Sequence, residues 1–190
     1  MEENKLTIAT ICGSLRKDSF NRKVLTAIER IAPEHWRFHH TNLATIPLYN
    51  EDTEKEGDPP SVVEFKESIR KADGVLIVTP EYNTGIPGVL KNALDWASRP
   101  SKDSVLIHKP FAIAGATPGN GGTAQSQAQV RQTLLAMNAY TLPGPKILIG
   151  RVHEKINGTT GLFDDDQTLH YLDRFLKTFE GWIRTFPNGD

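Results

Sequence analysis

The chain has 190 residues, with 22 lysines and arginines against 23 aspartates and glutamates, so its formal net charge at pH 7 is -1. A charge so near zero excludes the broad cationic field with which non-specific nucleic-acid-binding proteins hold polyanions. A chain of this length can bury roughly 70% of its unfolded surface, enough for one full hydrophobic core. We therefore expect residues 1–190 to form a single domain.

The number of cysteines and the lengths of the apolar stretches indicate where in the cell the protein is located. The single cysteine, Cys12, cannot form an internal disulfide, and residues 1–5 are acidic where a secretory signal is basic and then apolar. The longest apolar stretches, 75–78 and 111–114, fall far short of the roughly 18 residues that a membrane span requires. We expect a cytoplasmic protein without a membrane partner.

Short apolar runs alternate with helical periodicity along the chain, which predicts repeated β–α units. We expect a strand at 6–12, a helix at 20–32, a weak strand at 36–41, a polar loop at 42–60 and a helix at 61–72. The run 74–79 is typical of a central parallel strand buried on both faces. A helix at 88–98, a strand at 111–116, a helix at 123–136, a strand at 142–149 and a helix at 166–186 follow. The last helix is expected to turn Leu169, Leu172, Phe175, Phe179 and Trp182 inward.

Five strands alternating with five helices predict an α/β fold: a doubly wound, five-stranded parallel sheet with helices on both faces. The pattern does not order the strands, but the common doubly wound order for five strands is 2-1-3-4-5. In that order a crevice opens between the carboxyl ends of the first and third strands. A ligand site is therefore expected after Cys12 and after Thr79.

The loop after the first strand combines hydrogen-bond donors with a cation. Ser14, Ser19 and Asn21 can donate, Arg16 can pair with two phosphate oxygens at once, and a helix N-terminus with unpaired N–H groups follows. This loop suits a phosphate monoester. The structural alternative is that Ser19 or Asn21 caps the helix, Gly13 forms a turn and Arg16 is a solvated cation.

Several phosphate-handling classes do not match this loop. It contains neither GxGxxG, as in dinucleotide-binding folds, nor GxxxxGK[ST], as in P-loop proteins. A thiolate phosphatase needs a longer spacing than the four positions that separate Cys12 from Arg16, so we expect Cys12 to be a small buried hydrophobe. A phospho-acceptor receiver domain needs carboxylates where Gly13-Ser14 and Thr79-Pro80 stand.

The segment after the third strand, 79–96, reads TPEYNTGIPGVLKNALDW. Prolines and glycines stiffen a loop that offers an aromatic ring, an acid, an amide and bare backbone, a surface suited to a flat heteroaromatic ring. Together with GSLRKDSFN at 13–21 and GATPGNGG at 115–122, this segment resembles the NAD(P)H-dependent FMN reductase family of flavodoxin-like proteins. That family includes enzymes acting on quinones, chromate and azo dyes. The resemblance covers most of the chain, whereas the last 40 residues share only their helical character with it.

The resemblance implies FMN as cofactor, NAD(P)H as co-substrate and a small-molecule acceptor of the quinone, azo, chromate or free-flavin type. We hypothesise a ping-pong cycle with hydride transfer to FMN N5, in which no side chain acts as acid or base in the hydride step. The resemblance also supports a homodimer or homotetramer. The matching positions imply FMN contacts at Ser14, Arg16, Ser19, Phe20 and Asn21 for the phosphate, at Pro80, Glu81, Tyr82, Asn83 and Ile86 along the ribityl chain and flavin, and at Thr117, Pro118 and Gly119 on the other rim.

One position departs from the pattern of the family, and one arginine is a further candidate for ligand contact. Many relatives have serine just before Ile-Pro-Gly, whereas this chain has Gly85, so we do not expect a hydroxyl contact there. Arg99, just after the third expected helix, is a candidate for meeting an anionic cofactor or substrate.

Other polar or aromatic residues are expected to be structural. His39 and His40 have no acidic or cysteine partner at ligand spacing, so no metal site is expected. The run 164–166 is expected to cap the last helix. Asp95 and Trp96 are expected to be a satisfied carboxylate and a core or interface ring, and Trp96 with Tyr82 is expected near the site, where subunits would meet.

A competing interpretation from another class is a flavodoxin-type electron carrier, which binds FMN without turning over NAD(P)H directly. Such carriers are usually strongly acidic, because they steer onto basic partners. The net charge of -1 favours the reductase. A protein that only binds flavin remains a third interpretation.

Overall fold

The computed structural model describes residues 5–186, and statements below concern this part of the chain. Its strands are β1 (Leu6–Cys12), β2 (Trp36–His40), β3 (Gly74–Val78), β4 (Pro110–Ala116), β5 (Tyr140–Thr141) and β6 (Ile147–Ile149). Its helices are α1 (Phe20–Ile31), α2 (Glu51–Glu56), α3 (Pro60–Lys71), α4 (Gly88–Ala97), α5 (Ala124–Ala136) and α6 (Asp166–Thr185). The short 3₁₀ turns are η1 (Leu43–Thr45), η2 (Ser101–Asp103) and η3 (Val152–Lys155).

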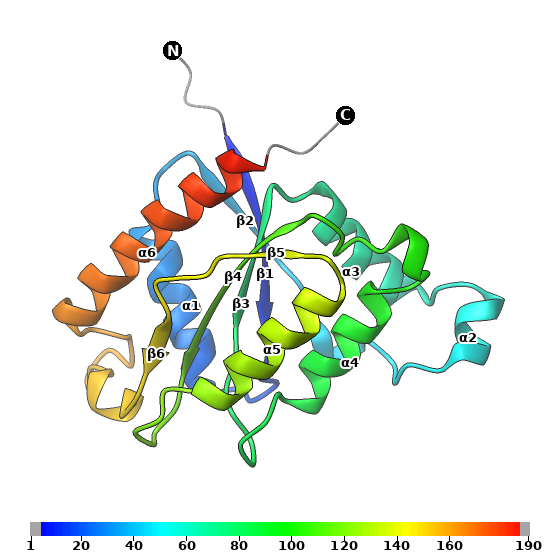
Figure 1. The fold of residues 1–190 in the computed structure, drawn as a ribbon. Helices are drawn as coiled ribbons and strands as arrows, with labels where there is room; N and C mark the ends of the chain where they lie inside the picture. The colour runs from blue at the N-terminus through cyan, green and yellow to red at the C-terminus, as the bar shows by residue number, and fades with distance from the viewer. Residues whose placement is uncertain (1–4, 187–190) are drawn as a thin grey trace.

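The sheet is parallel throughout and has the order β2-β1-β3-β4-β5, with β6 also paired to β4. The register places Cys12 beside Val78 and Val78 beside Ala114, so β1 and β3 end at one level and β4 runs two residues further, to Ala116. The predicted strand order is confirmed. The loops after these three strands therefore share one edge of the sheet, at the bottom of Figure 1, while the start of β1 and the end of α6 lie at the top.

Helices cover both faces of the sheet, as Figure 1 shows. One core cluster packs α1 and α6 against β-strand residues such as Ile8 and Leu76, and the other packs α3, α4 and α5 against residues such as Ile11 and Ile77. Alternate side chains of each central strand thus pack into opposite cores. For this reason β3, residues 74–78, is apolar at every position. Cys12 is buried at the end of β1, as expected.

The predicted fifth strand at 142–149 is wrong as a continuous element. Two short pieces pair with β4 instead, β5 near its start and β6 near its end. The intervening residues include Pro143 and Pro145, which have no N–H group to donate to a ladder, and Gly144-Pro145 is a cis peptide bond.

Smaller differences follow from local chemistry. The expected polar loop at 42–60 contains η1 and α2, and the latter is capped by the Asn50 side chain. In α6 the fully packed positions include Leu176 and Ile183, whereas Leu169 and Trp182 are only partly buried. Asp165 caps α6 by accepting the Thr168 N–H, which confirms the expectation for that acidic run.

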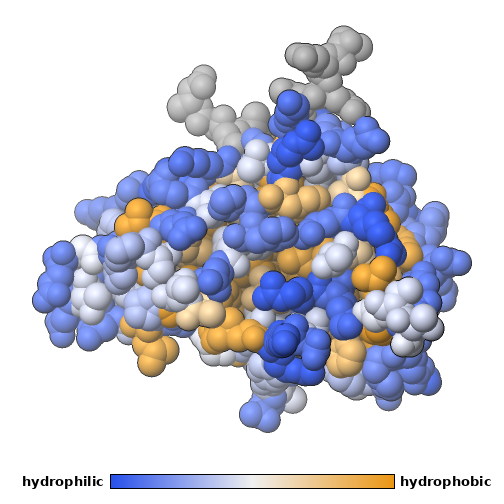
Figure 2. Space-filling view, turned by 180° about the vertical axis from the view of Figure 1, so that it is seen from behind, coloured by the Kyte–Doolittle hydropathy of each residue, from blue (hydrophilic) through white to orange (hydrophobic). Residues whose placement is uncertain are grey.

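Figure 2 shows the face opposite to that of Figure 1, where hydrophilic side chains predominate and hydrophobic ones show in a recess near the middle. Between residues 5 and 186, no helix is both long and apolar enough to cross a membrane.

Candidate active site

The loop between β1 and α1 leaves its main-chain donors free. Gly13 N–H donates to the Val78 carbonyl over 2.9 Å and so fastens the start of the loop to β3. Beyond it, and among the described groups, only the Arg16 N–H of residues 14–21 finds a protein acceptor, the Ser14 Oγ at 3.4 Å. These amides lead into the N-terminus of α1. They form the concentration of N–H donors that an anion prefers.

Side chains add to this donor set. Ser14 and Ser19 are buried, and Ser19 caps α1 by accepting the Arg22 N–H, which leaves its own O–H available to an acceptor. The Arg16 side chain stays near the loop, because its guanidinium lies 5.9 Å from the centre of the Phe20 ring. The N-cap interpretation of Ser19 is therefore correct, and it is compatible with a phosphate contact.

Asn21 holds two loops together. Its Nδ2 donates to the Ala116 carbonyl and its Oδ1 accepts the Ala116 N–H, both over 2.9 Å. Both residues are buried. The side chain therefore joins the start of α1 to the end of β4, and the Asn21 main-chain N–H is the group that stays free.

The loop after β3 ends in a tight hairpin turn. Tyr82 and Gly85 exchange two main-chain hydrogen bonds of 3.2 and 3.0 Å, and Asn83 and Thr84 between them have φ of 49° and 60°. Positive φ at both central residues is the geometry of a type I′ turn. The Tyr82 and Gly85 amides are used within the turn, so those of Asn83 and Thr84 remain for a ligand. Tyr82 is 49% exposed, as an open platform for a ring would be.

Helix α5 is hydrogen-bonded to this loop at two points. Glu81 Oε2 accepts the N–H groups of Gln125 and Ser126, over 2.8 and 3.0 Å, and so caps α5. One turn further on, Gln129 accepts the Ile86 N–H and donates to the Thr84 carbonyl. The main role of the Glu81 carboxylate is therefore to hold the loop against the N-terminus of α5.

The loop after β4 lies beside the other two. The Thr117 N–H donates to the Ile149 carbonyl, and the Thr117 hydroxyl accepts the Gly119 N–H. Pro118 and Gly119 are exposed. A Cβ built at Gly115 would overlap the Thr123 hydroxyl and the Thr79 carbonyl, so only glycine allows the loops after β3 and β4 to approach this closely.

Two residues expected near the site lie elsewhere. Arg99 follows the C-terminal end of α4, whose N-terminal end adjoins the site, and its guanidinium lies 5.3 Å from the centre of the Tyr49 ring. Trp96 is fully buried and donates to the Pro47 carbonyl. The expectation that Trp96 contributes to a subunit contact is wrong, because no part of its side chain reaches the surface, whereas its alternative reading as a core ring is confirmed. Asp95 is satisfied by Lys91 on the same helix.

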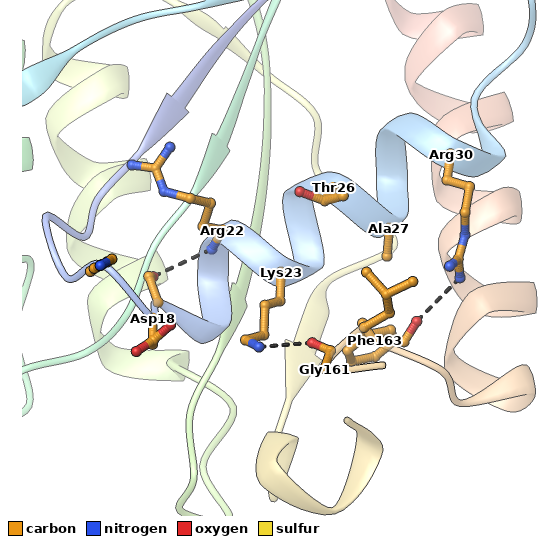
Figure 3. Close-up of a pocket in the computed structure, with 11 residues that line it drawn as sticks. Asp18, Arg22, Lys23, Thr26, Ala27, Arg30, Gly161 and Phe163 are labelled. Carbon is orange, nitrogen blue, oxygen red and sulfur yellow. Dashed lines mark hydrogen bonds between the residues drawn. The ribbon is translucent and has the colours of Figure 1, made fainter. Parts of the chain in front are cut away.

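A separate hollow of about 260 Å³ lies between α1 and the segment 161–163. Figure 3 shows Lys23 and Arg30 reaching from α1 to the carbonyl groups of Gly161 and Phe163, over 2.7 and 3.2 Å, while Arg22 points elsewhere. Both cations therefore tie the segment to the helix. The hollow touches the anion loop only at residues 17–19.

A titratable cluster joins β1, β2 and the C-terminal part of α1. His40 Nδ1 is 2.9 Å from the Thr10 hydroxyl and 3.6 Å from Glu29 Oε1. Burial raises the pKa of Glu29 above 4.5, and His40 acts in the opposite direction. Among the described residues there is no group of three or more His, Cys, Asp or Glu that could hold a metal ion.

The donors at this edge fit a flavin mononucleotide. Free loop amides, two hydroxyls and an arginine match a phosphate dianion, and the turn after β3 presents two free amides beside an exposed aromatic ring. The family model described as NADPH-dependent FMN reductase matches residues 6–154. The chain belongs to this family. It is an enzyme, with FMN as cofactor and NAD(P)H as co-substrate, which confirms the sequence prediction.

Relatives of this FMN reductase cover almost its whole length. A 2-hydroxy-1,4-benzoquinone reductase from Burkholderia sp is 41% identical over 180 residues, 94% of this chain and 97% of that protein. A quinone reductase from Escherichia coli is 41% identical over 182 residues, 95% of this chain and 96% of that protein. Among solved structures, the flavoenzyme NAD(P)H:(acceptor) oxidoreductase FerB from Paracoccus denitrificans is similar with a TM-score of 0.88 and 35% identity, covering 95% of this chain and 98% of that one.

Sequence reasoning located all three loops but missed Gln129. It lies on the exposed side of a predicted helix, where apolar periodicity carries no signal. A polar residue on such a face ordinarily contacts only water, and only the packing of α5 against the hairpin turn gives this one its partners.

Proposed function

We propose that this enzyme transfers two electrons from NAD(P)H to a quinone-type acceptor, in a ping-pong cycle in which the two substrates use one place in turn. The observation that carries the proposal is the set of free main-chain amides in residues 14–21, all but that of Arg16, together with a turn that offers the Asn83 and Thr84 amides. The names of the curated relatives support quinones as the acceptor class. Azo compounds, chromate and free flavin are further candidates.

In the proposed arrangement the first loop holds the FMN phosphate. The amides of residues 14–21, the hydroxyls of Ser14 and Ser19 and the Arg16 guanidinium supply the donors, with Phe20 beside them. Asn21 contributes its main-chain N–H, while its side chain holds the loop in place. The positive end of α1 adds to the attraction for a dianion.

The second and third loops hold the flavin ring. Pro80, Tyr82, Asn83 and Ile86 line one side and Thr117, Pro118 and Gly119 the other, with Glu81 acting through its bonds to α5. FMN, when bound, supplies the redox chemistry, accepting a hydride from NAD(P)H and passing two electrons to the acceptor. The free amides of Asn83 and Thr84 are the groups that would hydrogen-bond and tune the ring. The hydride step needs no acid or base from the chain.

The decisive experiment is anaerobic. Adding NADPH to the purified yellow protein should bleach the flavin absorption within seconds, and adding a quinone should restore it. Double-reciprocal plots of the steady-state rate against NADPH concentration, made at several fixed quinone concentrations, should give parallel lines. Absorption that persists until a separate reductase is added would instead support the flavodoxin-type carrier, and intersecting lines would refute the ping-pong order.

We further propose that the chain forms a homodimer or homotetramer. The exposed Leu15 and Tyr82 at the site edge support a contact there, at 50% and 49% exposure. Sedimentation at micromolar concentration tests this, since a species of about 21 kDa would refute it. The cytoplasmic location stays a prediction, supported by the single cysteine.

A further inference from the structure

The Gln129 carboxamide binds the hairpin turn as a neighbouring β-strand would. Its Oε1 accepts the Ile86 N–H over 3.0 Å, and its Nε2 donates to the Thr84 carbonyl over 3.2 Å. A primary amide carries one acceptor and two donor hydrogens on one rigid plane, so it can pair with a C=O and an N–H of one extended segment at the same time. No other described side chain bonds both edges of this turn.

The turn needs such support. Asn83 and Thr84 have positive φ although neither is glycine, a conformation that costs free energy unless the surroundings hold it. Both residues are exposed, so little packing fixes them. Within the turn, the Tyr82 and Gly85 main chains are joined by two hydrogen bonds, and the Thr84 hydroxyl donates to the Asn83 carbonyl.

The Gln129 carboxamide lies against the chain at Gly85. A Cβ built on Gly85 would be 3.4 Å from Gln129 Oε1 and 3.8 Å from Nε2, so the amide covers the face of the chain where a side chain would otherwise project. The turn therefore rests on α5 through this one residue, while Glu81 fastens the start of the same loop.

We infer that Gln129 is a positioning residue of this reductase, which holds the hairpin turn at residues 82–85 in the form that receives the flavin ring. The inference rests on the proposed place of FMN. Gln129 acts through the turn. When the turn is already ordered before binding, no binding free energy is lost in ordering it, and the affinity for the ligand is higher.

Three variants test the inference. Gln129→Ala removes both bonds, Gln129→Glu keeps the acceptor and loses the donor, and Gln132→Ala is the control, an exposed glutamine on the same helix. Binding of FMN and of riboflavin to the apoprotein is followed by flavin fluorescence. We expect Gln129→Ala to raise both dissociation constants by about two- to tenfold, the range for exposed hydrogen bonds. Riboflavin has no phosphate, so an equal loss for both ligands locates the effect at the ring end.

A pH series with riboflavin separates positioning from general destabilisation. The Gln129→Glu carboxylate repels the Thr84 carbonyl, but the protonated acid again offers a donor and an acceptor. Its affinity relative to wild type should therefore recover as the pH falls through roughly 4 to 5. In the apoprotein, hydrogen exchange of the Ile86 amide should be faster in Gln129→Ala than in the control.

The outcomes are distinguishable. Wild-type affinity for both flavins in Gln129→Ala would overturn the inference, as would a loss for FMN alone or a Gln129→Glu profile that runs parallel to wild type. If Gln129→Ala does not fold, the pH series on Gln129→Glu decides alone. A wild-type protein that binds neither flavin would refute the proposed function itself, and the inference with it.

Discussion

Replacing Asn21 by alanine separates two roles that one residue can have at the anion loop. If the side chain binds phosphate, its removal weakens FMN binding and leaves the apoprotein intact. The structure instead shows the carboxamide bonded to both main-chain groups of Ala116. We therefore expect Asn21→Ala to destabilise the protein before any cofactor is added.

The magnitude follows from burial. Ala116 is 1% exposed and Asn21 is 3% exposed, so water cannot readily replace the lost partner. Each buried polar group left unsatisfied costs about 1–3 kcal/mol. Two such groups, with partial relief by water entering the space of the deleted side chain, give a loss of about 3 kcal/mol in the free energy of unfolding. For a domain of this size that corresponds to a melting temperature lowered by roughly 6–12 °C.

The assay is thermal and urea unfolding of the apoprotein, because bound FMN would add stability of its own. Ser14→Ala is the matched comparison, since it removes a proposed phosphate donor whose hydroxyl, among the described residues, makes one hydrogen bond, a 3.4 Å contact with the Arg16 N–H. It should leave the apoprotein melting point nearly unchanged and weaken FMN binding more than riboflavin binding. An Asn21→Ala apoprotein that melts within about 2 °C of wild type would refute the reasoning.

Three further predictions concern packing and charge. Gly115→Ala should destabilise by about 1–3 kcal/mol or more, because its Cβ would overlap Thr123 and the Thr79 carbonyl, and chemical denaturation measures this. Burial raises the pKa of Glu29 in the folded protein. The stability that protonated Glu29 contributes is therefore fully present below pH 4.5 and is lost as the pH rises through the pKa of the folded state. Glu29→Gln should therefore be more stable than wild type at pH 7 and lose this advantage in acid; an advantage that does not change with pH would contradict it. The bonds from Thr168 and then Lys155 lower the pKa of Asp165, so its contribution is present above 3.8 and is lost as the pH falls through the folded value. Asp165→Ala should cost about 1 kcal/mol at neutral pH, and unfolding curves should converge with wild type in strong acid.

Much of the fold follows from local pattern. The first strand at Leu6–Cys12 occupies the predicted residues, and most helices begin or end within a residue or two of expectation. Central parallel strands are buried on both faces and read as apolar runs, so their signal is strong. The fifth strand failed because pairing with β4 resumes after a proline-containing interruption, and apolar residues alone do not report where N–H donors are missing.

The candidate site was predicted from the sequence only in part. The sequence located the loops, because donors, glycines and prolines after strand ends carry their own chemical signal, and the resemblance named the cofactor. It did not separate residues that face the ligand from those that hold the loops. Glu81 and Asn21 have the polar groups of ligand contacts, yet their bonds to Ser126 and Ala116 join segments far apart in the chain.

Length, charge and composition determined that this chain is of ordinary size and near-neutral charge, and its motifs determined the edge of the sheet at which we propose that FMN binds. Only the tertiary structure decided that Arg99 follows the far end of α4, that Trp96 is sealed in the core and that Gln129 holds the turn. The physical reason is that a residue's type and spacing set what it can bind. What it does bind depends on which distant backbone groups the packing of α4, α5 and β4 brings within hydrogen-bond distance.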